Sequence, residues 1–360
     1  MSRLIPLTAF ELSGIVVSYE KYPLGYKIRL LRGEEQMLRR VFQFPSKNLL
    51  TVIPAALFLG FSVGLFADTA FLKKYILVTT FLMIYPTMIG FRFREGLRFT
   101  EKRLLLLAAV MNFLVIPVFA YFLGSLFFGS RPELLAGLAI LAILPTSGMT
   151  ISWTLLFKGN VAGAVKITAF GLVIGALLAP WYLVLTVGQF VPLNPLAVSK
   201  TISTVVFLPL VAGFITQHLL RRVYTEDRFT RDIRPLLPAA SVWGLLALMF
   251  MSMSMKTKMI LSQPELILQV LGVLALFYTV NFALGTVIGQ RVLAPRDAVA
   301  LVYGSAVRNL SISLGVAVAT FGPTAALLVT LAFLVQVQAA PWYGKIIEHF
   351  GLIPATAEGI

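Results

Sequence analysis

Two short polar segments, residues 143–150 and residues 304–313, interrupt long apolar stretches of this chain. They combine hydroxyl, amide and guanidinium groups, which bind solutes through hydrogen bonds and charge. At the depth of a membrane such groups have few partners other than a solute or each other. The side chains that we expect to bind substrate are Thr146, Ser147, Thr150, Arg308, Asn309, Ser311 and Ser313. They suit a small anion or a polar neutral solute better than a cation.

The same two segments contain residues that interrupt helices. Pro145 lacks a backbone donor and clashes with the preceding helical turn, and Gly148 and Gly304 lack a side chain. Backbone groups freed from a helix in lipid cost several kcal/mol each unless they face a cavity or a partner. We therefore predict helix breaks at Pro145, Gly148 and Gly304, which cross near the middle of the bilayer and line a polar cavity. The alternative is that the small residues allow continuous helices to pack closely.

Two cations fall inside the apolar stretches, whereas no carboxylate lies near the centre of one. A charge within the membrane costs about 2.5 kcal/mol or more, so it indicates a function. Arg308 is too deep to reach the interface, and we expect it to hold an anion or to take the place of a bound cation. Lys166 lies near the start of its stretch, where it either extends its ammonium to the interface or carries protons. Asn112 and Asn281 either bond a neighbouring backbone or line the cavity.

The composition is that of an integral membrane protein. Hydrophobic residues make up 58% of the chain, 12% of residues are charged and the mean hydropathy is +0.89, values far from those of soluble domains. The sequence has no cysteine, and it contains no metal-ligand spacing, nucleotide-binding motif or paired acid and base. We therefore expect no enzyme activity, no metal and no cofactor, while the coupling ion, H+ or Na+, stays open.

The chain contains an internal repeat. The tetrapeptide Ala-Pro-Trp-Tyr at residues 179–182 recurs at residues 340–343, and Thr146 aligns with Asn309. Apolar runs long enough to cross about 30 Å of hydrocarbon number ten, five in each half, so the halves are predicted to be inverted copies. The predicted parts are residues 1–48 as a basic cytoplasmic segment, 49–187 as the first five-helix repeat, 188–200 as a loop, 201–347 as the second five-helix repeat and 348–360 as a short tail.

The distribution of charge predicts the orientation in the membrane. With ten spans, most of the 30 Lys and Arg residues lie on one side, so both termini are expected in the cytoplasm. The net charge of +15 reflects this bias, and nucleic-acid binding is the weaker explanation. Residues 27–44 form either an interfacial helix or a solvated tail. The predicted fold is an all-α integral protein of the plasma membrane, with ten transmembrane helices in two inverted five-helix repeats and crossed, broken helices four and nine.

Several segments of the chain resemble the arsenite permease (arsenical-resistance) family, within the bile acid:sodium symporter superfamily. Residues 83–86 are similar to that family's Met-x-Tyr-Pro segment, and residues 112–117 to its Asn-Trp and Pro. Residues 145–159 follow the spacing of its Pro-Cys-x-x-Met-x-x-x-Trp run and the Gly-Asp after it, through Pro145, Met149, Trp153, Leu156, Lys158 and Gly159. Arg308-Asn309 and residues 315–322 are similar as well. The resemblance implies a ten-helix transporter with inverted repeats.

The resemblance also implies chemistry that this sequence lacks. The cysteine expected to meet trivalent arsenic aligns with Thr146, whose hydroxyl cannot replace a thiolate for that soft ligand. Two glutamates of the family align with Ser311 and Gln336, and Gln336 is a further candidate for coupling or for lining the cavity. The sodium-binding carboxylate of the bile-acid branch is replaced by a small residue, and Arg308 replaces its glutamine. We therefore expect this chain to share the fold of the superfamily. We do not expect it to share the coupling chemistry of either the arsenite-permease branch or the bile-acid branch.

These observations favour a secondary active transporter of this superfamily that moves a small anion or a polar neutral solute by alternating access. The first alternative is an efflux permease for arsenite or antimonite without the usual cysteine. The second is a membrane receptor or structural subunit that binds a solute without transporting it, which the missing coupling groups indicate. In each case the expected partners are the lipid bilayer and a small-molecule solute, and not nucleic acid.

Overall fold

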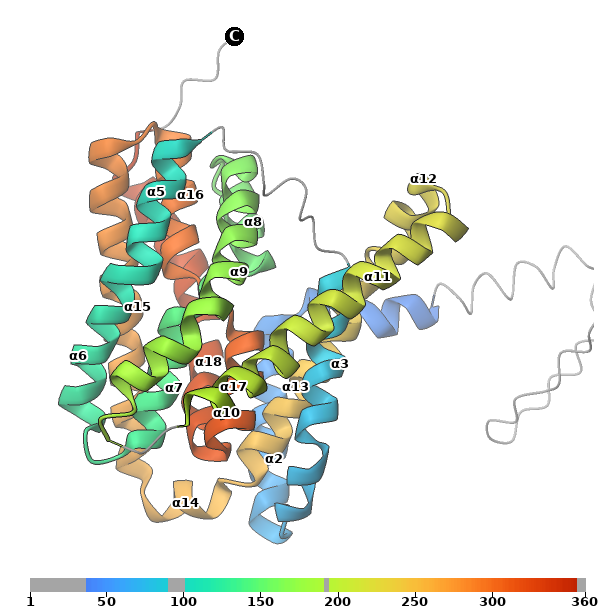
Figure 1. Cartoon of the computed structure of the whole chain (residues 1–360), viewed down its shortest axis with the longest axis vertical. Coiled ribbons are helices and arrows are strands. Elements are labelled where there is room, and N and C mark those ends of the chain that lie inside the picture. Colours follow the sequence, from blue (N-terminus) through green and yellow to red (C-terminus); the bar gives the residue numbers. More distant parts are fainter. Residues whose placement is uncertain (1–36, 90–100, 191–193, 355–360) are drawn as a thin grey trace, which may run out of the picture. The chain divides into compact units, whose positions relative to one another are not determined.

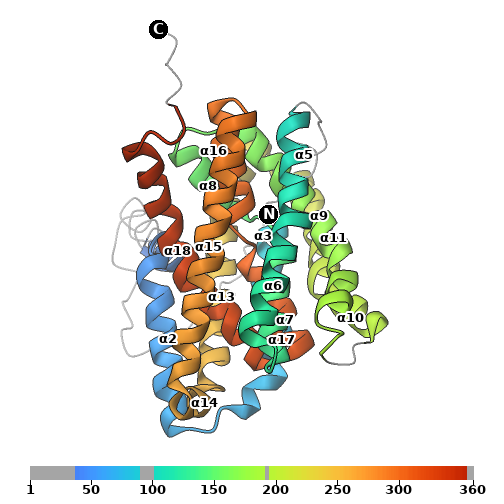
Figure 2. The ribbon, with the colours of Figure 1, turned by 90° about the vertical axis from the view of Figure 1, so that its left-hand side faces the viewer.

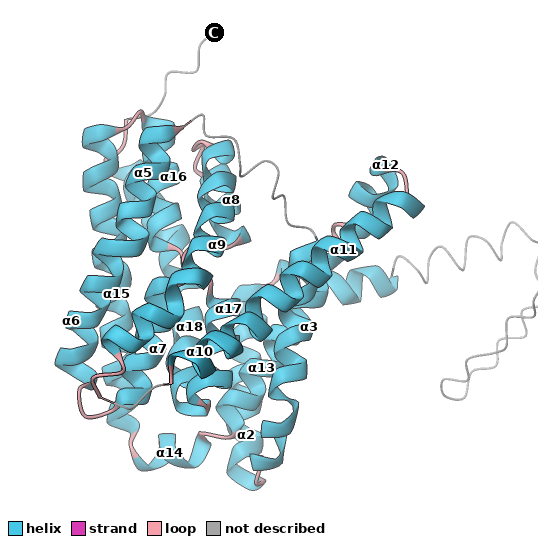
Figure 3. Cartoon of the chain, viewed as in Figure 1, coloured by secondary structure: helices cyan, strands magenta, loops and turns pink. Residues whose placement is uncertain are grey.

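The protein is seen in a computed structural model that describes residues 37–89, 101–190 and 194–354. Every regular element in these ranges is a helix, and strand pairing there is limited to one isolated bridge between Pro145 and Arg308 (Figure 3). The predicted all-α class is therefore confirmed. Most of the predicted basic N-terminal segment, the basic loop at residues 90–100 and the end of the tail lie outside the described residues.

Residues 45–360 form one compact unit, separate from residues 1–44. Its first helices are α2 (Leu49–Phe66), η2 (Ala70–Tyr75), α3 (Ile76–Ile89), α5 (Lys102–Val110), η3 (Met111–Val115), α6 (Ile116–Phe128), α7 (Pro132–Ile143), α8 (Gly148–Leu156) and α9 (Val161–Thr186). The helices that follow are α10 (Pro195–Ile202), η4 (Ser203–Phe207), α11 (Leu208–Val223), α12 (Glu226–Arg228), η5 (Phe229–Ile233), α13 (Leu236–Ser254), α14 (Thr257–Ser262), α15 (Pro264–Val292), α16 (Pro295–Ala306), α17 (Leu310–Phe321) and α18 (Pro323–His349).

Proline and asparagine residues determine where several of these helices begin. α7, α15, α16 and α18 each begin with a proline, whose fixed φ suits the first helical position and whose missing N–H would be unpaired there in any case. Asn160 caps α9, because its Oδ1 accepts a hydrogen bond of 2.9 Å from Gly163 N. Its Nδ2 also donates to Asp297 Oδ1 at 2.7 Å, so the same cap joins α9 to the first turn of α16.

Among the described residues, seven helical stretches, some made of consecutive labelled elements, are long and apolar enough to cross a membrane, or eight if the bent pair at residues 37–66 counts as one span. α7 and α17 are apolar but have only 12 residues each. At a rise of 1.5 Å per residue that is about 18 Å, which is shorter than a hydrocarbon core of about 30 Å. The predicted fourth and ninth spans are thus not single long helices, because one is divided into α7 and α8 and the other into α16 and α17.

Two groups of helices pack against each other in this unit, as Figures 1 and 2 show. We call α2, α3, α11 and α13 the panel, because they pack mainly on one another, and α5 to α9 with α15 to α18 the crossing bundle. α17 packs against α3, and α18 packs against α2 and α13, so these two helices join the bundle to the panel. α8 packs instead against α9 and α16, inside its own group.

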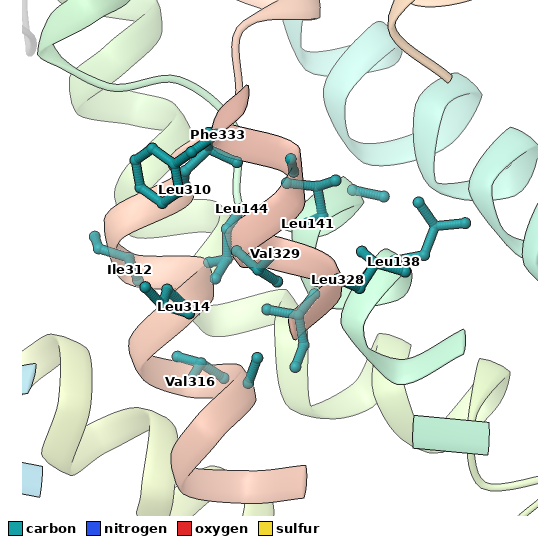
Figure 4. Packing of buried hydrophobic residues seen from close by; sticks show 14 of the residues in the cluster. Leu138, Leu141, Leu144, Leu310, Ile312, Leu314, Val316, Leu328, Val329 and Phe333 are labelled. Carbon is teal, nitrogen blue, oxygen red and sulfur yellow. The ribbon is translucent and has the colours of Figure 1, made fainter. Parts of the chain in front are cut away.

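The centre of the crossing bundle is apolar and closely packed. Leu141 of α7, Leu314 of α17 and Leu328 of α18 belong to one buried cluster (Figure 4). Helices in lipid gain little from the hydrophobic effect, so they depend on van der Waals packing and on small residues that let backbones approach. Gly137 is such a residue, because a Cβ there would lie 2.7 Å from Ala325 O. α7 and α18 therefore approach each other to backbone contact.

Candidate functional site at the helix crossing

The two helix breaks lie side by side and pair with each other. α7 ends at Ile143 and α8 begins at Gly148, while α16 ends at Ala306 and α17 begins at Leu310. Across the gap, two backbone hydrogen bonds run in antiparallel fashion, Thr146 N to Val307 O at 3.1 Å and Asn309 N to Leu144 O at 3.0 Å. Peptide groups released from one helix are thus satisfied by the other break, which removes most of the cost of unpaired backbone in lipid.

The second break does not lie where the sequence predicts it. Pro145 lies between helices and Gly148 is the first residue of α8, but Gly304 lies inside α16, two residues before that helix ends. A Cβ at Gly304 would lie 3.0 Å from Ile167 Cδ1 of α9. The glycine therefore allows α16 and α9 to pack closely. Close helix packing was the alternative to a helix break for the small residues of these segments.

Side chains cap the two helices that start at the crossing. Ser147 Oγ accepts from Met149 N at 3.2 Å, and Thr150 Oγ1 accepts from Ser147 N at 3.4 Å. In the same way Asn309 Oδ1 accepts from Ile312 N at 3.2 Å. Three of the predicted binding residues, Ser147, Thr150 and Asn309, thus satisfy backbone groups at the N-terminal ends of α8 and α17, where the helix dipoles carry partial positive charge.

The Arg308 side chain is fully buried and donates to four protein oxygens. Its Nε donates to Leu141 O at 3.2 Å, and its Nη1 donates to Asn112 Oδ1 at 2.7 Å and to Ser305 O at 2.8 Å. Its Nη2 donates to Ala142 O. All four acceptors are neutral carbonyl oxygens, and none of them belongs to a carboxylate.

Gln336 of α18 holds the backbone of the second break. Its Oε1 accepts from Arg308 N at 2.7 Å, and its Nε2 donates to Arg308 O at 3.2 Å. The same Oε1 accepts a hydrogen bond of 2.9 Å from the hydroxyl of Tyr278 in α15. All three residues are buried. An amide has both a donor and an acceptor to offer, which is why Gln336 can satisfy the N–H and the C=O of one residue.

Asn112 and Asn281 are both buried amides, but they have different surroundings. Asn112 lies in the π-helical turn η3, and besides accepting from Arg308 it donates from Nδ2 to Gly304 O at 2.9 Å. π-Helical turns are frequent at functional sites, because the extra residue redirects side chains. Asn281 of α15 has no protein hydrogen bond at either Oδ1 or Nδ2. The first amide is therefore part of the Arg308 network, and the second is unsatisfied.

Two hydroxyls near the crossing have no partner in the protein. The Oγ1 atom of Thr146 and the Oγ atom of Ser313 are buried without a hydrogen bond. Ser311, on the first turn of α17, is partly exposed, and Gly148 is exposed with no atom within 4 Å of a side chain placed there. The two hydroxyls thus have hydrogen-bonding capacity that the protein does not use, and Ser311 and Gly148 are accessible positions beside them.

Lys166 has a carboxylate partner in the described part of the chain. It is buried in α9, and its ammonium forms an ion pair with Glu101, just before α5. Glu101 could not be recognised as this partner from residue types, because it precedes the predicted third span and is remote along the chain. Tyr278 was not among the predicted site residues, although its position one helical turn before Asn281 places it on the same face of α15.

A cavity of about 250 Å³ adjoins the crossing. It lies between α5 with η3 on one side and α9 on the other, and it is mostly apolar. Asn112 and Gly171 line it, and a Cβ at Gly171 would lie 3.1 Å from Thr146 Oγ1. Gly171 therefore lies between the cavity and the unpaired hydroxyl of Thr146 at the first break.

Comparison with known proteins identifies the family. Residues 77–263 match the Sodium Bile acid symporter family. The protein YbaS of Bacillus subtilis is 24% identical over 255 residues, which are 69% of this chain and 80% of YbaS. The arsenical-resistance protein Acr3 of Corynebacterium glutamicum is 23% identical over 301 residues, 77% of this chain and 80% of the relative. Acr3 of Alkaliphilus metalliredigens is 23% identical over 201 residues, 52% of this chain and 56% of the relative.

The resemblance to arsenite permeases within the bile acid:sodium symporter superfamily is thereby confirmed. The family match includes part of the panel and the whole first break, and it covers more than half of the chain. Together with the long apolar helices, it shows that this multi-pass membrane protein is a transporter that belongs to the Sodium Bile acid symporter family.

Proposed function

We propose that this protein is a secondary active transporter that moves a small anion or a polar neutral solute by alternating access, and that the solute binds where the α7–α8 break crosses the α16–α17 break. The observation that carries the proposal is the pairing of the two breaks through Thr146 and Asn309. Broken helices that meet in the middle of a bundle are the recurrent substrate site of secondary transporters.

We infer that α7 with α8 and α16 with α17 are the fourth and ninth spans of a ten-helix protein made of two inverted five-helix repeats. The seven long helices, α2 and the two divided spans together support this count. The repeats correspond to residues 49–187 and 201–347, joined by the loop at residues 188–200. Both termini, with the basic segment 1–48 and the tail 348–360, face the cytoplasm, and the membrane is the plasma membrane.

The charge at the crossing favours an anion or a neutral solute. Within the described ranges, no carboxylate is buried. The N-terminal ends of α8 and α17 add partial positive charge. A cationic solute would meet repulsion without a buried carboxylate to offset it, whereas the free hydroxyls of Thr146 and Ser313 and the accessible Ser311 can bond an oxygen-rich solute.

The two half-helices that start at the crossing differ in how they are covered, which supports access from one side. α17 packs against α3 of the panel, whereas Gly148 and Ser152 of α8 are exposed. Lys158 follows α8, on the side that the basic loops assign to the cytoplasm. This arrangement is that of an inward-facing state. Rocking of the bundle against the panel would cover α8 and open the α17 side.

The named relatives give a second candidate solute. Two of them are arsenical-resistance proteins, which favours efflux of arsenite or antimonite as the alternative function. Neutral arsenous acid offers hydroxyl groups that Thr146 and Ser313 can bond, even though a hydroxyl does not replace a thiolate for arsenic itself.

The test is binding followed by transport. Purified protein is heated with arsenite, antimonite, small carboxylates and bile acids, and a solute that binds the folded state raises the melting temperature with the logarithm of its concentration. Each solute that binds is then offered to proteoliposomes. We expect binding and flux for at least one small polar solute, and we expect Ser313→Ala to weaken both.

Ser254→Ala provides the matched control. Ser254 is also a buried serine, but its hydroxyl bonds Met251 O within α13, away from the crossing. Equal loss in the two variants would contradict a substrate site at the crossing. Binding without flux would instead support a receptor, and binding confined to arsenite and antimonite would support the alternative.

A further inference from the structure

The family's name implies sodium as the coupling ion, so the crossing can be tested for its fit to that ion. In secondary transporters Na+ is held by unwound backbone carbonyls and by the C-terminal ends of half-helices. Two half-helices, α7 and α16, end at this crossing, and the carbonyl oxygens of their last turns are Leu141 O, Ala142 O and Ser305 O. The oxygens that such an ion would need are therefore present.

These oxygens already bind a cation that belongs to the chain. Each of the three carbonyls, and Asn112 Oδ1 beside them, accepts a hydrogen bond from the Arg308 guanidinium. The distances to Leu141, Asn112 and Ser305 are 3.2, 2.7 and 2.8 Å. Three of the oxygens lie at the C-terminal ends of α7 and α16, and the fourth belongs to Asn112 in η3. All four therefore point at the same group, the guanidinium of Arg308.

The charge of this site is balanced by Arg308 alone. Each helix C-terminus is equivalent to about −0.5 elementary charge, so α7 and α16 together supply about one negative charge. The fully buried guanidinium supplies one positive charge. A sodium ion at the same oxygens would add a second positive charge that no described buried carboxylate offsets. The site therefore does not fit Na+ while Arg308 is in place.

We propose that Arg308 is a tethered cation that permanently fills a cation site at the C-terminal ends of α7 and α16, so that this member of the family uses no sodium ion at the crossing. The proposal goes beyond the proposed function, because it concerns the coupling ion and not the solute. It also predicts a new property: removing the guanidinium uncovers a site for a small metal cation. A side chain that only fills space between the helices would leave no such site.

The test compares sodium binding by the wild-type protein and by Arg308→Ala. Melting temperatures are measured in choline chloride with Na+ added at constant ionic strength, and with Li+ and K+ in parallel. The wild-type protein is expected to respond to Na+ no more than to choline. Arg308→Ala is expected to melt lower in choline and to be stabilised by Na+, with a rise in melting temperature that follows the logarithm of the Na+ concentration.

Two further variants separate the cation site from a general loss of packing. Arg308→Lys keeps a tethered positive charge, so its melting temperature should not respond to Na+. Adding Asn112→Ala to Arg308→Ala removes one of the four oxygens and should weaken the response to Na+. If Arg308→Ala does not fold, Arg308→Gln takes its place in the same comparison, since it removes the charge with a smaller change in volume.

Two outcomes would overturn the proposal. One is a specific stabilisation of the wild-type protein by Na+ that is lost in Asn112→Ala, which removes the side-chain oxygen of this set, because the ion would then bind beside Arg308. The other is a neutral variant at position 308 that folds but responds to none of the three cations. Neither outcome depends on the transported solute, so the proposed function can fail or stand independently.

Discussion

The break between α7 and α8 and the break between α16 and α17 pair with each other, but different forces form them. In the first, Thr146 follows Pro145 with a φ of 55°, in the left-handed region that side chains disfavour. In the second, Val307 and Asn309 keep φ values of −77° and −83°, so the backbone is not strained there. The first break is imposed locally by proline, whereas the second depends on hydrogen bonds from residues far along the chain.

The half-helices that follow the two breaks differ as well. Leu155 and Leu156 of α8 are 65% and 60% exposed, whereas Leu314 and Val316 of α17 are fully buried. Two segments with related sequences therefore have opposite environments. In a transporter that alternates between two states, we interpret this asymmetry as one state of the pair, with the α8 side open and the α17 side closed.

The largest effect is expected from removing the side chain that holds the second break. Arg308→Met leaves Leu141 O, Ala142 O, Ser305 O and Asn112 Oδ1 without their donor, and each buried unpaired acceptor costs about 1–3 kcal/mol, so we expect a loss of about 4 kcal/mol or more. At the equivalent position of the first break, Pro145→Ala removes no hydrogen bond and should cost about 1 kcal/mol or less.

Unfolding in mixed micelles with increasing SDS, in sodium-free buffer, measures this difference. Equal destabilisation by Arg308→Met and Pro145→Ala would contradict the view that only the second break depends on side-chain hydrogen bonds to residues far along the chain.

A smaller effect is expected at Gln336. Gln336→Leu leaves the N–H of Arg308 and the hydroxyl of Tyr278 unpaired, while the C=O of Arg308 keeps its bond from Leu310 N, and each buried unsatisfied group costs about 1–3 kcal/mol. We expect a loss of about 3 kcal/mol in the same assay. Tyr278→Phe removes only one of these hydrogen bonds and serves as the control, with a loss of about 1 kcal/mol. A loss for Tyr278→Phe as large as that for Gln336→Leu would assign the main support to the tyrosine instead.

The two asparagines allow a matched comparison between the halves. Asn112→Ala leaves Gly304 O and one N–H of Arg308 unpaired, so it should destabilise the protein by about 2 kcal/mol. Asn281→Ala removes an amide with no protein partner, so stability should change little or increase, because burying an unpaired polar group is itself unfavourable. A clear loss of stability in Asn281→Ala would instead indicate a partner such as an ordered water at that amide.

The sequence predicted some parts of this crossing and could not predict others. The chain leaves its helix around Pro145 because of the covalent structure of proline, which needs no knowledge of the fold. Gly304 has no such local effect, and its role in packing depends on Ile167, a residue of another helix. The acceptors of Arg308 are mostly backbone carbonyls, which every residue has, so residue types cannot identify them. The depth of Arg308 in an apolar stretch predicted a functional group that either holds an anion or takes the place of a bound cation, but it could not identify the oxygens that Arg308 contacts.

The smallest effect on stability, and the most direct test of the asymmetry, comes from single cysteines. The natural chain has none, so Ser152→Cys in α8 and Val316→Cys in α17 can each be made without further changes. Ser152 is exposed and Val316 is fully buried, so a maleimide that cannot cross the membrane should modify the first from the cytoplasmic side and leave the second unmodified. A solute that drives transport should reduce labelling at position 152 and raise it at position 316. Labelling of both positions from the same side, unchanged by solute, would mean that the different burial of α8 and α17 is a fixed property of the fold and not one state of an alternating pair.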